Sequence, residues 1–480
     1  APAAPAADSS SAADADSDAP AADNPATPAG GAGIYPGTPD PDTIVIDNAQ
    51  EPPDLVPFTT TTTGSGNVLR ETLFGLVELD EGDMPVPAVA ESWESAANAE
   101  GVENMVWTFH LRNDFKWTVT GAEYADLNGT PVTAHDFIYA WTKALTPSVG
   151  AQYNYMCYIF KNGEKFFNGE CGIEEVGFKA VDDYTIEIEL ENPLSYLLSQ
   201  LTFYTFKPVN QKIYETIGED KYNREAASFA ANGPYNMTEW VHEDRILLEA
   251  NENYPDVANV KVPKVKIVSI ADSNTKLNGF RAGEIDMIGL NAEQVAMLEA
   301  EGQPIQHYND GSTWYMQYNT TRQGLGSPKI RKALTMAINR ESFIKDVIKN
   351  NTTVADYFTS SAINGVDGPF VDVLKAEGIT FEYDPEAAKA LFEEGLAEAG
   401  LASVEEFNAL GYSITTDTGD TALRDCQFYQ EQWKTNLGVE VGINQMTYQA
   451  RVEATHQGEY DISLFGWGPD YNDPMTFLDL

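Results

Sequence analysis

The stretch that decides the fold of this chain runs from residue 460 to residue 474 and reads YDISLFGWGPDYNDP. Its first half, Tyr460 to Phe465, contains aromatic and β-branched residues and is typical of a β-strand. Pro469 and Pro474 prevent regular continuation of that strand, because proline lacks the N–H of the ladder. Asp470 therefore follows a strand end, where open α/β sheets bind ligands. A carboxylate there can hold a cation, although Asp in such a sequence is also an ordinary turn former.

Strand and helix signals alternate from Thr43 onward, which indicates an α/β fold. The pattern predicts strands at Thr43–Ile46 and Val439–Ile443 and a hairpin from Val176–Val181 and Tyr184–Leu190. It predicts helices at Asn67–Leu79 and Ala422–Leu437 and after Ser327-Pro328 and Asp384-Pro385, where a capping residue precedes a proline at the first helical position.

The composition excludes several classes of partner. A net charge of −45, from 74 acidic and 29 basic residues, argues against binding to nucleic acid or to an anionic membrane surface. No apolar run approaches the roughly 18 residues that cross a bilayer.

The five histidines are scattered, and the chain lacks a phosphate loop, a Gly-x-Ser-x-Gly elbow and a zinc-binding His-Glu-x-x-His helix. We therefore expect no metal and no cofactor.

The three cysteines leave one question open. Cys157 and Cys171 bracket a polar, Gly-containing loop and could close a disulfide in an oxidising compartment, or they could stay as thiols. Cys426 lies in a helical pattern and is expected to be buried.

Residues 1–33 consist mainly of Ala, Pro, Ser, Asp and Gly and contain no aromatic residue, so they cannot bury enough surface to fold. We expect a disordered tether. The chain starts without the basic and apolar regions of a signal peptide, and we expect that such a peptide has been removed.

Six short segments are shared with one family. The chain resembles the extracellular solute-binding proteins of the dipeptide and oligopeptide class, the receptor components of ABC importers, at residues 107–112 (WTFHLR), 131–137 (PVTAHDF), 179–185 (KAVDDYT), 232–235 (NGPY), 280–286 (FRAGEID) and 467–474 (WGPDYNDP). The order and spacing of the segments make this resemblance specific.

The resemblance implies a two-lobed periplasmic-binding-protein-like fold with a hinge and an inserted extra domain. Residues 40–74 and 200–310 would build lobe I, residues 75–199 the inserted domain, and residues 311–480 lobe II. Because the family continues beyond the segment at 467–474, we expect lobe II to be incomplete at its C-terminal end.

The resemblance also implies the ligand-binding residues. Asp470 would receive the α-ammonium group of a peptide, Trp467 would stack on a ligand side chain, and the backbone of Gly466 to Gly468 would pair with the peptide as an added strand. Of the neighbours Trp314 and Tyr315, only one can face the pocket, and the alignment favours Tyr315.

Two positions depart from the family. The run Thr59–Thr63 follows Leu55-Val56-Pro57 where the family has Leu-Asp-Pro. Thr62 and Thr63 would lie on a second pairing strand, or the run is only an exposed loop. Leu464 occupies the place of a basic cleft residue, so recognition of a ligand carboxylate is in doubt.

The function expected from the resemblance is capture of oligopeptides between two lobes for import, without catalysis. The partners would be a peptide and an ABC permease, and the protein would be a monomer on the extracellular face of the membrane, lipid-anchored, or periplasmic. Two alternatives remain, another solute such as an oligosaccharide and, in a different class, a carboxylate-based hydrolase.

Overall fold

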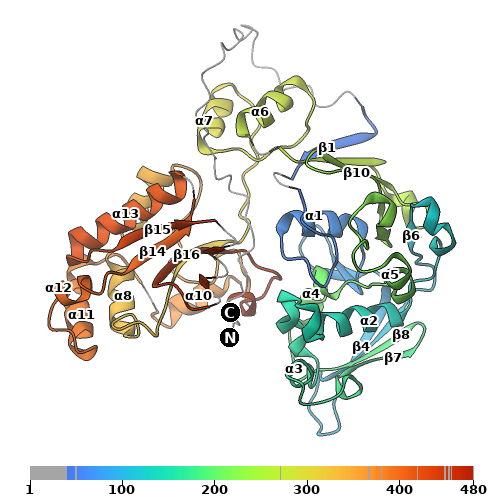
Figure 1. Cartoon of the computed structure of the whole chain (residues 1–480), viewed down its shortest axis with the longest axis horizontal. Coiled ribbons are helices and arrows are strands. Elements are labelled where there is room, and N and C mark those ends of the chain that lie inside the picture. Colours follow the sequence, from blue (N-terminus) through green and yellow to red (C-terminus); the bar gives the residue numbers. More distant parts are fainter. Residues whose placement is uncertain are drawn as a thin grey trace. The chain divides into compact units, whose positions relative to one another are not determined.

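A computed structural model describes residues 40–48, 51–270, 272–365, 368–379, 381–418, 420–447, 450–451, 454–455 and 457–478. The tether expected at residues 1–33 lies outside them. The chain divides into two compact units (Figure 1). The larger unit holds Tyr35–Ile288 together with Asp470–Asp473, and the smaller unit holds Gly289–Pro469 together with Pro474–Leu480. Within the described ranges, no helix has the length and apolar character of a membrane span.

The larger unit contains two four-stranded sheets. In the first, of order β1-β12-β11-β10, β1 runs parallel to β12 and the other pairs are antiparallel. The second, of order β4-β5-β8-β7, is antiparallel throughout. Two short pairs, β2-β3 and β6-β9, complete the unit. The strands are β1 (Thr43–Asp47), β2 (Val77–Leu79), β3 (Pro85–Pro87), β4 (Ala90–Ala96), β5 (Val106–Leu111), β6 (Thr118–Val119), β7 (Phe178–Asp182), β8 (Thr185–Glu189), β9 (Ala230–Ala231), β10 (Tyr235–Val241), β11 (Arg245–Ala250) and β12 (Lys264–Val268).

Helices and a large apolar core hold these sheets together, and a second, small apolar cluster contains Val45, Val268 and Ile285. Helix α2 packs against β7, and its Trp141 is fully buried beside Phe160 and Phe178. Burial of such large aromatic side chains is a main source of stability. The helices are α1 (Thr63–Thr72), α2 (Ala134–Leu145), α3 (Gly163–Phe167), α4 (Leu197–Gln200), α5 (Gln211–Ile217) and α6 (Ser273–Ala282).

The smaller unit is built on one sheet of order β13-β16-β14-β15. Strand β16 runs antiparallel to β13 and parallel to β14, and β14 runs parallel to β15. Helix α13 packs against β14 and β15, and α11 packs against α8 and α13 (Figure 1). The elements are α7 (Ala292–Ala300), β13 (Thr313–Tyr318), α8 (Pro328–Met336), α9 (Arg340–Phe343), α10 (Phe370–Ala376), α11 (Pro385–Glu398), α12 (Val404–Asn408), β14 (Ser413–Asp417), α13 (Asp420–Leu437), β15 (Gly442–Met446), β16 (Ile462–Trp467) and α15 (Met475–Leu478).

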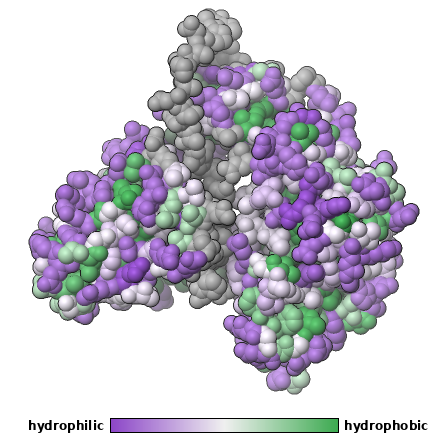
Figure 2. Space-filling model, viewed as in Figure 1, coloured by the Kyte–Doolittle hydropathy of each residue, from purple (hydrophilic) through white to green (hydrophobic). Residues whose placement is uncertain are grey.

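The α/β fold and most of the predicted elements are confirmed, with three differences. Ser327 precedes α8 as predicted, but its side chain makes no capping hydrogen bond. The predicted helix Asn67–Leu79 is instead α1, which ends at Thr72, followed by β2. The strand predicted at Val439–Ile443 begins only at Gly442, as β15. The boundaries of the lobes and the inserted domain stay a prediction. The face shown in Figure 2 is mostly hydrophilic, as the strongly acidic composition leads one to expect.

Candidate functional site

The backbone of β16 is oriented by its pairing with β13. The backbone N–H of Asn319 donates to the backbone carbonyl oxygen of Asp461 at 2.9 Å, so the backbone N–H and C=O of Asp461 point toward β13. In an antiparallel ladder, the backbone N–H and C=O groups of successive residues point alternately toward the partner strand and away from it. The N–H and C=O of Gly466, five residues on, therefore point away from β13.

Among the described residues, that side of β16 is paired only in part. Strand β14 pairs with Ile462 and Ser463, and the guanidinium of Arg451 then donates to the carbonyl oxygen of Leu464. No strand in the part of the chain that the structure describes pairs with Gly466 on this side. Gly466 itself is buried, and half-buried Gly468 follows the strand end. The N–H and C=O of Gly466 are the groups that an added extended chain would have to reach.

Trp314 and Tyr315 lie on opposite faces of the sheet, as the alternation along a strand requires. Trp314 is 51% exposed, and its indole lies over the Cα of its cross-strand partner Gly466. Tyr315 is half-buried and packs edge-on against Phe358, with ring centroids 4.7 Å apart. The exposed indole is thus the aromatic surface next to the open backbone of Gly466.

Trp467 belongs to a small apolar cluster with Ile363 and Phe477. Its side chain is 1% exposed, and its indole N–H is one of the buried polar groups for which no acceptor is found among the described residues. A buried donor without an acceptor costs free energy. The role of Trp467 in stacking on a ligand stays a prediction.

Asp470 groups with the larger unit, together with Tyr471 to Asp473. Burial raises the pKa of its carboxyl to about 8. Burial, and after it the charge of Asp470, raise the pKa values of Tyr153 and Tyr204. The rings of these two tyrosines meet edge-on, with centroids 5.9 Å apart. Tyr471 stacks on Tyr196 at 5.1 Å and nearly parallel, at 7°.

Asp470 as a whole is half-buried, and the raised pKa reflects burial of its carboxyl group. The structure therefore gives Asp470 an environment that differs from that of an exposed turn residue. The role of Asp470 in holding an ammonium group stays a prediction.

Tyr153, Tyr204 and Arg451 were not predicted from the sequence. About 270 to 320 residues of chain separate the two tyrosines from Asp470, and no local pattern links them. Arg451 forms a two-bond pair with Asp417, at 2.8 and 2.9 Å, and its guanidinium lies 4.1 Å from the centroid of the Phe465 ring. For Arg451, the one sequence feature that pointed to its surroundings was the departure from the family at Leu464, whose carbonyl oxygen Arg451 binds.

The remaining predicted residues have local structural roles. Thr62 caps α1 by accepting the amide of Ser65 at 3.2 Å, and Thr63 is the first residue of that helix, so neither lies on a strand. Cys157 and Cys171 are not bonded to each other in this structure, and the disulfide left open above stays a prediction. Buried Cys426 is as expected. In the described ranges, no three His, Cys, Asp or Glu side chains are grouped as metal ligands.

Comparisons with known proteins place these features in context. The family model described as bacterial extracellular solute-binding proteins, family 5 Middle, matches residues 84–480. The chain is 34% identical over 444 residues to the oligopeptide-binding protein OppA of Bacillus subtilis, covering 91% of this chain and 77% of that protein. It is 31% identical over 447 residues to the periplasmic oligopeptide-binding protein OppA of Salmonella typhimurium, covering 92% and 77%. The solved structure of Listeria monocytogenes OppA bound to peptide superposes with a TM-score of 0.73 at 29% identity, covering 92% of this chain and 83% of that one.

Proposed function

The chain belongs to the bacterial extracellular solute-binding proteins of family 5, and we propose that it binds oligopeptides and delivers them to an ABC permease. The relatives named above are peptide-binding proteins, and one of them carries a peptide in its solved structure. In this proposal the protein acts as a monomer, is held by a lipid anchor at the extracellular face of the membrane, and performs no catalytic step.

The open backbone of Gly466 at the edge of β16 carries this proposal. A peptide in extended conformation would exchange main-chain hydrogen bonds with Gly466 as an added strand. Its α-ammonium group would pair with the carboxyl of Asp470 in a charge-assisted hydrogen bond. Recognition of main chain and amino terminus leaves the side chains of the peptide largely free.

The surroundings of Leu464 bear on the other end of the peptide. The buried guanidinium of Arg451 is engaged by Asp417 and the Leu464 carbonyl, and position 464 itself supplies no charge. A peptide carboxylate would therefore find no cation from either residue. We propose that peptides of several lengths bind, because their carboxyl ends are not fixed here.

The test is native mass spectrometry of the protein after incubation with a peptide mixture of graded length. The expected result is one-to-one complexes with unmodified peptides and far fewer complexes with their N-acetylated forms at the same concentration. Oligosaccharide complexes in place of peptide complexes would contradict the proposed ligand. Shortened peptides that accumulate with time would indicate a hydrolase, and a single Asp or Glu substitution that abolishes their formation would establish it.

A further inference from the structure

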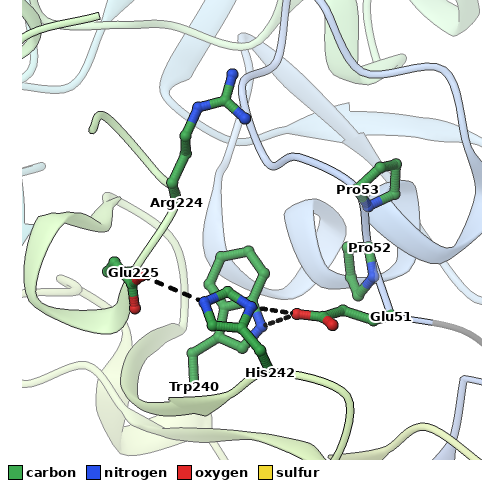
Figure 3. Close-up of a pocket in the computed structure, with 7 residues that line it drawn as sticks. All are labelled: Glu51, Pro52, Pro53, Arg224, Glu225, Trp240 and His242. Atoms are coloured by element: carbon green, nitrogen blue, oxygen red, sulfur yellow. Dashed lines mark hydrogen bonds and ion pairs between the residues drawn. The ribbon is translucent and has the colours of Figure 1, made fainter. Parts of the chain in front are cut away.

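His242 lies between two carboxylates in the larger unit, in the turn that joins β10 to β11 (Figure 3). Its Nδ1 faces Glu51 within hydrogen-bonding distance, and its Nε2 lies 3.3 Å from Glu225. Glu51 is 191 residues from His242 in sequence, in the segment that leads to α1, and Glu225 immediately precedes the short 3₁₀ turn Ala226–Ser228. The imidazole thus bridges two chain segments from a third.

The position of Glu51 does not depend on His242 alone. Its carboxylate also accepts the indole N–H of Trp240 at 2.8 Å and the amide of Glu243 at 2.8 Å. Trp240 lies against the imidazole, with ring centroids 4.9 Å apart. These contacts hold both ring nitrogens of His242 toward carboxylate oxygens.

This arrangement fits only one protonation state. A neutral imidazole has one N–H donor and one acceptor nitrogen, whereas the imidazolium has two donors. Because carboxylates face both nitrogens, a neutral ring would set a nitrogen lone pair against an oxygen of Glu51 or Glu225. We propose that His242 is a proton-dependent clamp, which holds the segment from Glu51 to Val56 in place when the imidazole is charged and loosens it when the imidazole is neutral.

The charges around the ring favour the charged form of His242. The hydrogen bond to Glu51, followed by that to Glu225, raises the pKa of His242. Glu51, Glu225, Trp240 and His242 line one pocket, and Arg224 lines it too, but the guanidinium of Arg224 points away from the imidazole (Figure 3). On the turn itself, Glu243 is adjacent in sequence and Asp244 pairs with Arg245. Since the folded pKa lies above the ordinary value of about 6.5, the clamp is complete below that value and is lost as the pH rises through the folded pKa.

The clamped segment leads directly to α1. The carbonyl oxygen of Leu55 accepts from Asn223 at 2.9 Å, and the carbonyl oxygen of Asp54 accepts from Ser65 at 2.7 Å. Loosening at Glu51 would therefore reach Thr62 and Thr63 at the start of that helix. The clamp is argued from the contacts of His242 alone. An effect of the clamp on peptide affinity would in addition require the proposed function, peptide binding.

Hydrogen exchange followed by mass spectrometry tests the clamp in the full chain without ligand. After correction for intrinsic exchange rates, amides of residues 54–56 should lose protection as the pH rises through the raised pKa of His242. In His242→Gln, the corrected exchange rate of the same amides should not change with pH. The matched control is His110→Gln, because among the residues that the structure describes His110 pairs with a single carboxylate, that of Glu94 at 3.3 Å. Its profile should equal that of the wild type.

Two results would overturn the clamp. One is a wild-type profile that stays flat with pH, and the other is a His242→Gln profile that changes as much as the wild type. Glu225→Gln, which keeps the imidazole and removes one carboxylate, should shift the midpoint of the transition to lower pH. Calorimetric peptide titrations of the wild type and His242→Gln then separate the two proposals. If exchange changes with pH while the ratio of the two affinities does not, the clamp stands and its link to peptide binding fails.

Discussion

The indole of Trp314 covers Gly466 on the neighbouring strand so closely that a Cβ on Gly466 would lie 3.0 Å from the ring. Gly466→Ala should displace the indole by a few tenths of an ångström. Because Trp314 is 51% exposed and can move, the free energy of unfolding should fall by less than the roughly 1–3 kcal/mol of overpacking in a core. Peptide affinity should fall as well, because the ring and the open backbone lie side by side.

Chemical denaturation and calorimetry on the same variant measure both effects. Gly289→Ala is the control, since a Cβ there meets nothing within 4 Å. Peptide affinity that is unchanged in Gly466→Ala would argue that the ligand does not pair at this edge.

Asp136 should be a major determinant of the stability of the larger unit. It is 3% exposed and accepts the indole N–H of Trp117 at 2.9 Å, the amide of Thr133 at 3.0 Å and the amide group of Asn210 at 2.8 Å. Asp136→Ala leaves three donors without an acceptor and should lower the free energy of unfolding by about 3 kcal/mol or more. Denaturant titration measures this, with exposed Asp183→Ala as the control expected to change little.

The pH dependence of that loss has a defined sign. Burial raises the pKa of Asp136 to about 6 in the folded protein, above the value of 3.8 in the unfolded chain. The folded state therefore binds this proton more tightly, and stability falls as the pH rises from about 4 to about 6. The difference in stability between the wild type and Asp136→Ala should shrink over this interval, and a difference that grows would contradict the assignment.

The sequence predicts elements well where local chemistry sets their ends. Asp384 caps α11 by accepting the amide of Ala387 at 2.9 Å, and Pro385 occupies its first turn, both as predicted. Helix α1 was predicted too long for a tertiary reason. The side chain of Asn232, 158 residues away, accepts the amide of Phe74, and Glu78 accepts that of Gly75, so the backbone after Thr72 is bound outside the helix.

The candidate site was predictable only in part, because contacts between residues distant in sequence determine much of it. A strand followed by a Pro-flanked turn marks β16 and Asp470, because those signals are local. The burial that raises the pKa of Asp470, the two tyrosines near it and the bond from Arg451 to Leu464 all come from residues distant in sequence or unremarkable in it. The backbone direction of Gly466 follows from the register with β13, which no sequence pattern specifies.

Asp470→Asn tests the residue that the family resemblance and the pKa both single out. Loss of the counter-charge should weaken peptide binding by about 3 kcal/mol or more, roughly a hundredfold in Kd. N-acetylation of the peptide should weaken wild-type binding similarly and barely change binding to the variant, because both changes remove one interaction. Calorimetry on the four combinations measures the coupling. Two full and additive losses would mean that the amine is held elsewhere.

The pH profile of peptide affinity gives an independent test of the same pair. The complex needs an ionised Asp470 and a protonated α-amine, but in the protein without peptide the pKa of Asp470 is raised to about 8, and the α-amine titrates at about 7.7–8.0. Below pH 8, binding must therefore release a proton, and affinity should fall about tenfold for each pH unit. Above pH 8 the amine loses its proton and affinity should fall again, so the maximum lies near pH 8.

Calorimetry in buffers of different ionisation enthalpy, at pH 6.5, should detect nearly one proton released for each peptide bound. Without peptide, the same raised pKa means that stability declines as the pH rises toward 8, because the folded state favours the protonated carboxyl. Asp470→Asn is the control for both measurements and should release no proton and lack the acidic limb of the affinity profile. Affinity that is level from pH 6 to pH 8 in the wild type would show that Asp470 is already ionised before the peptide arrives, and that its burial does not control binding.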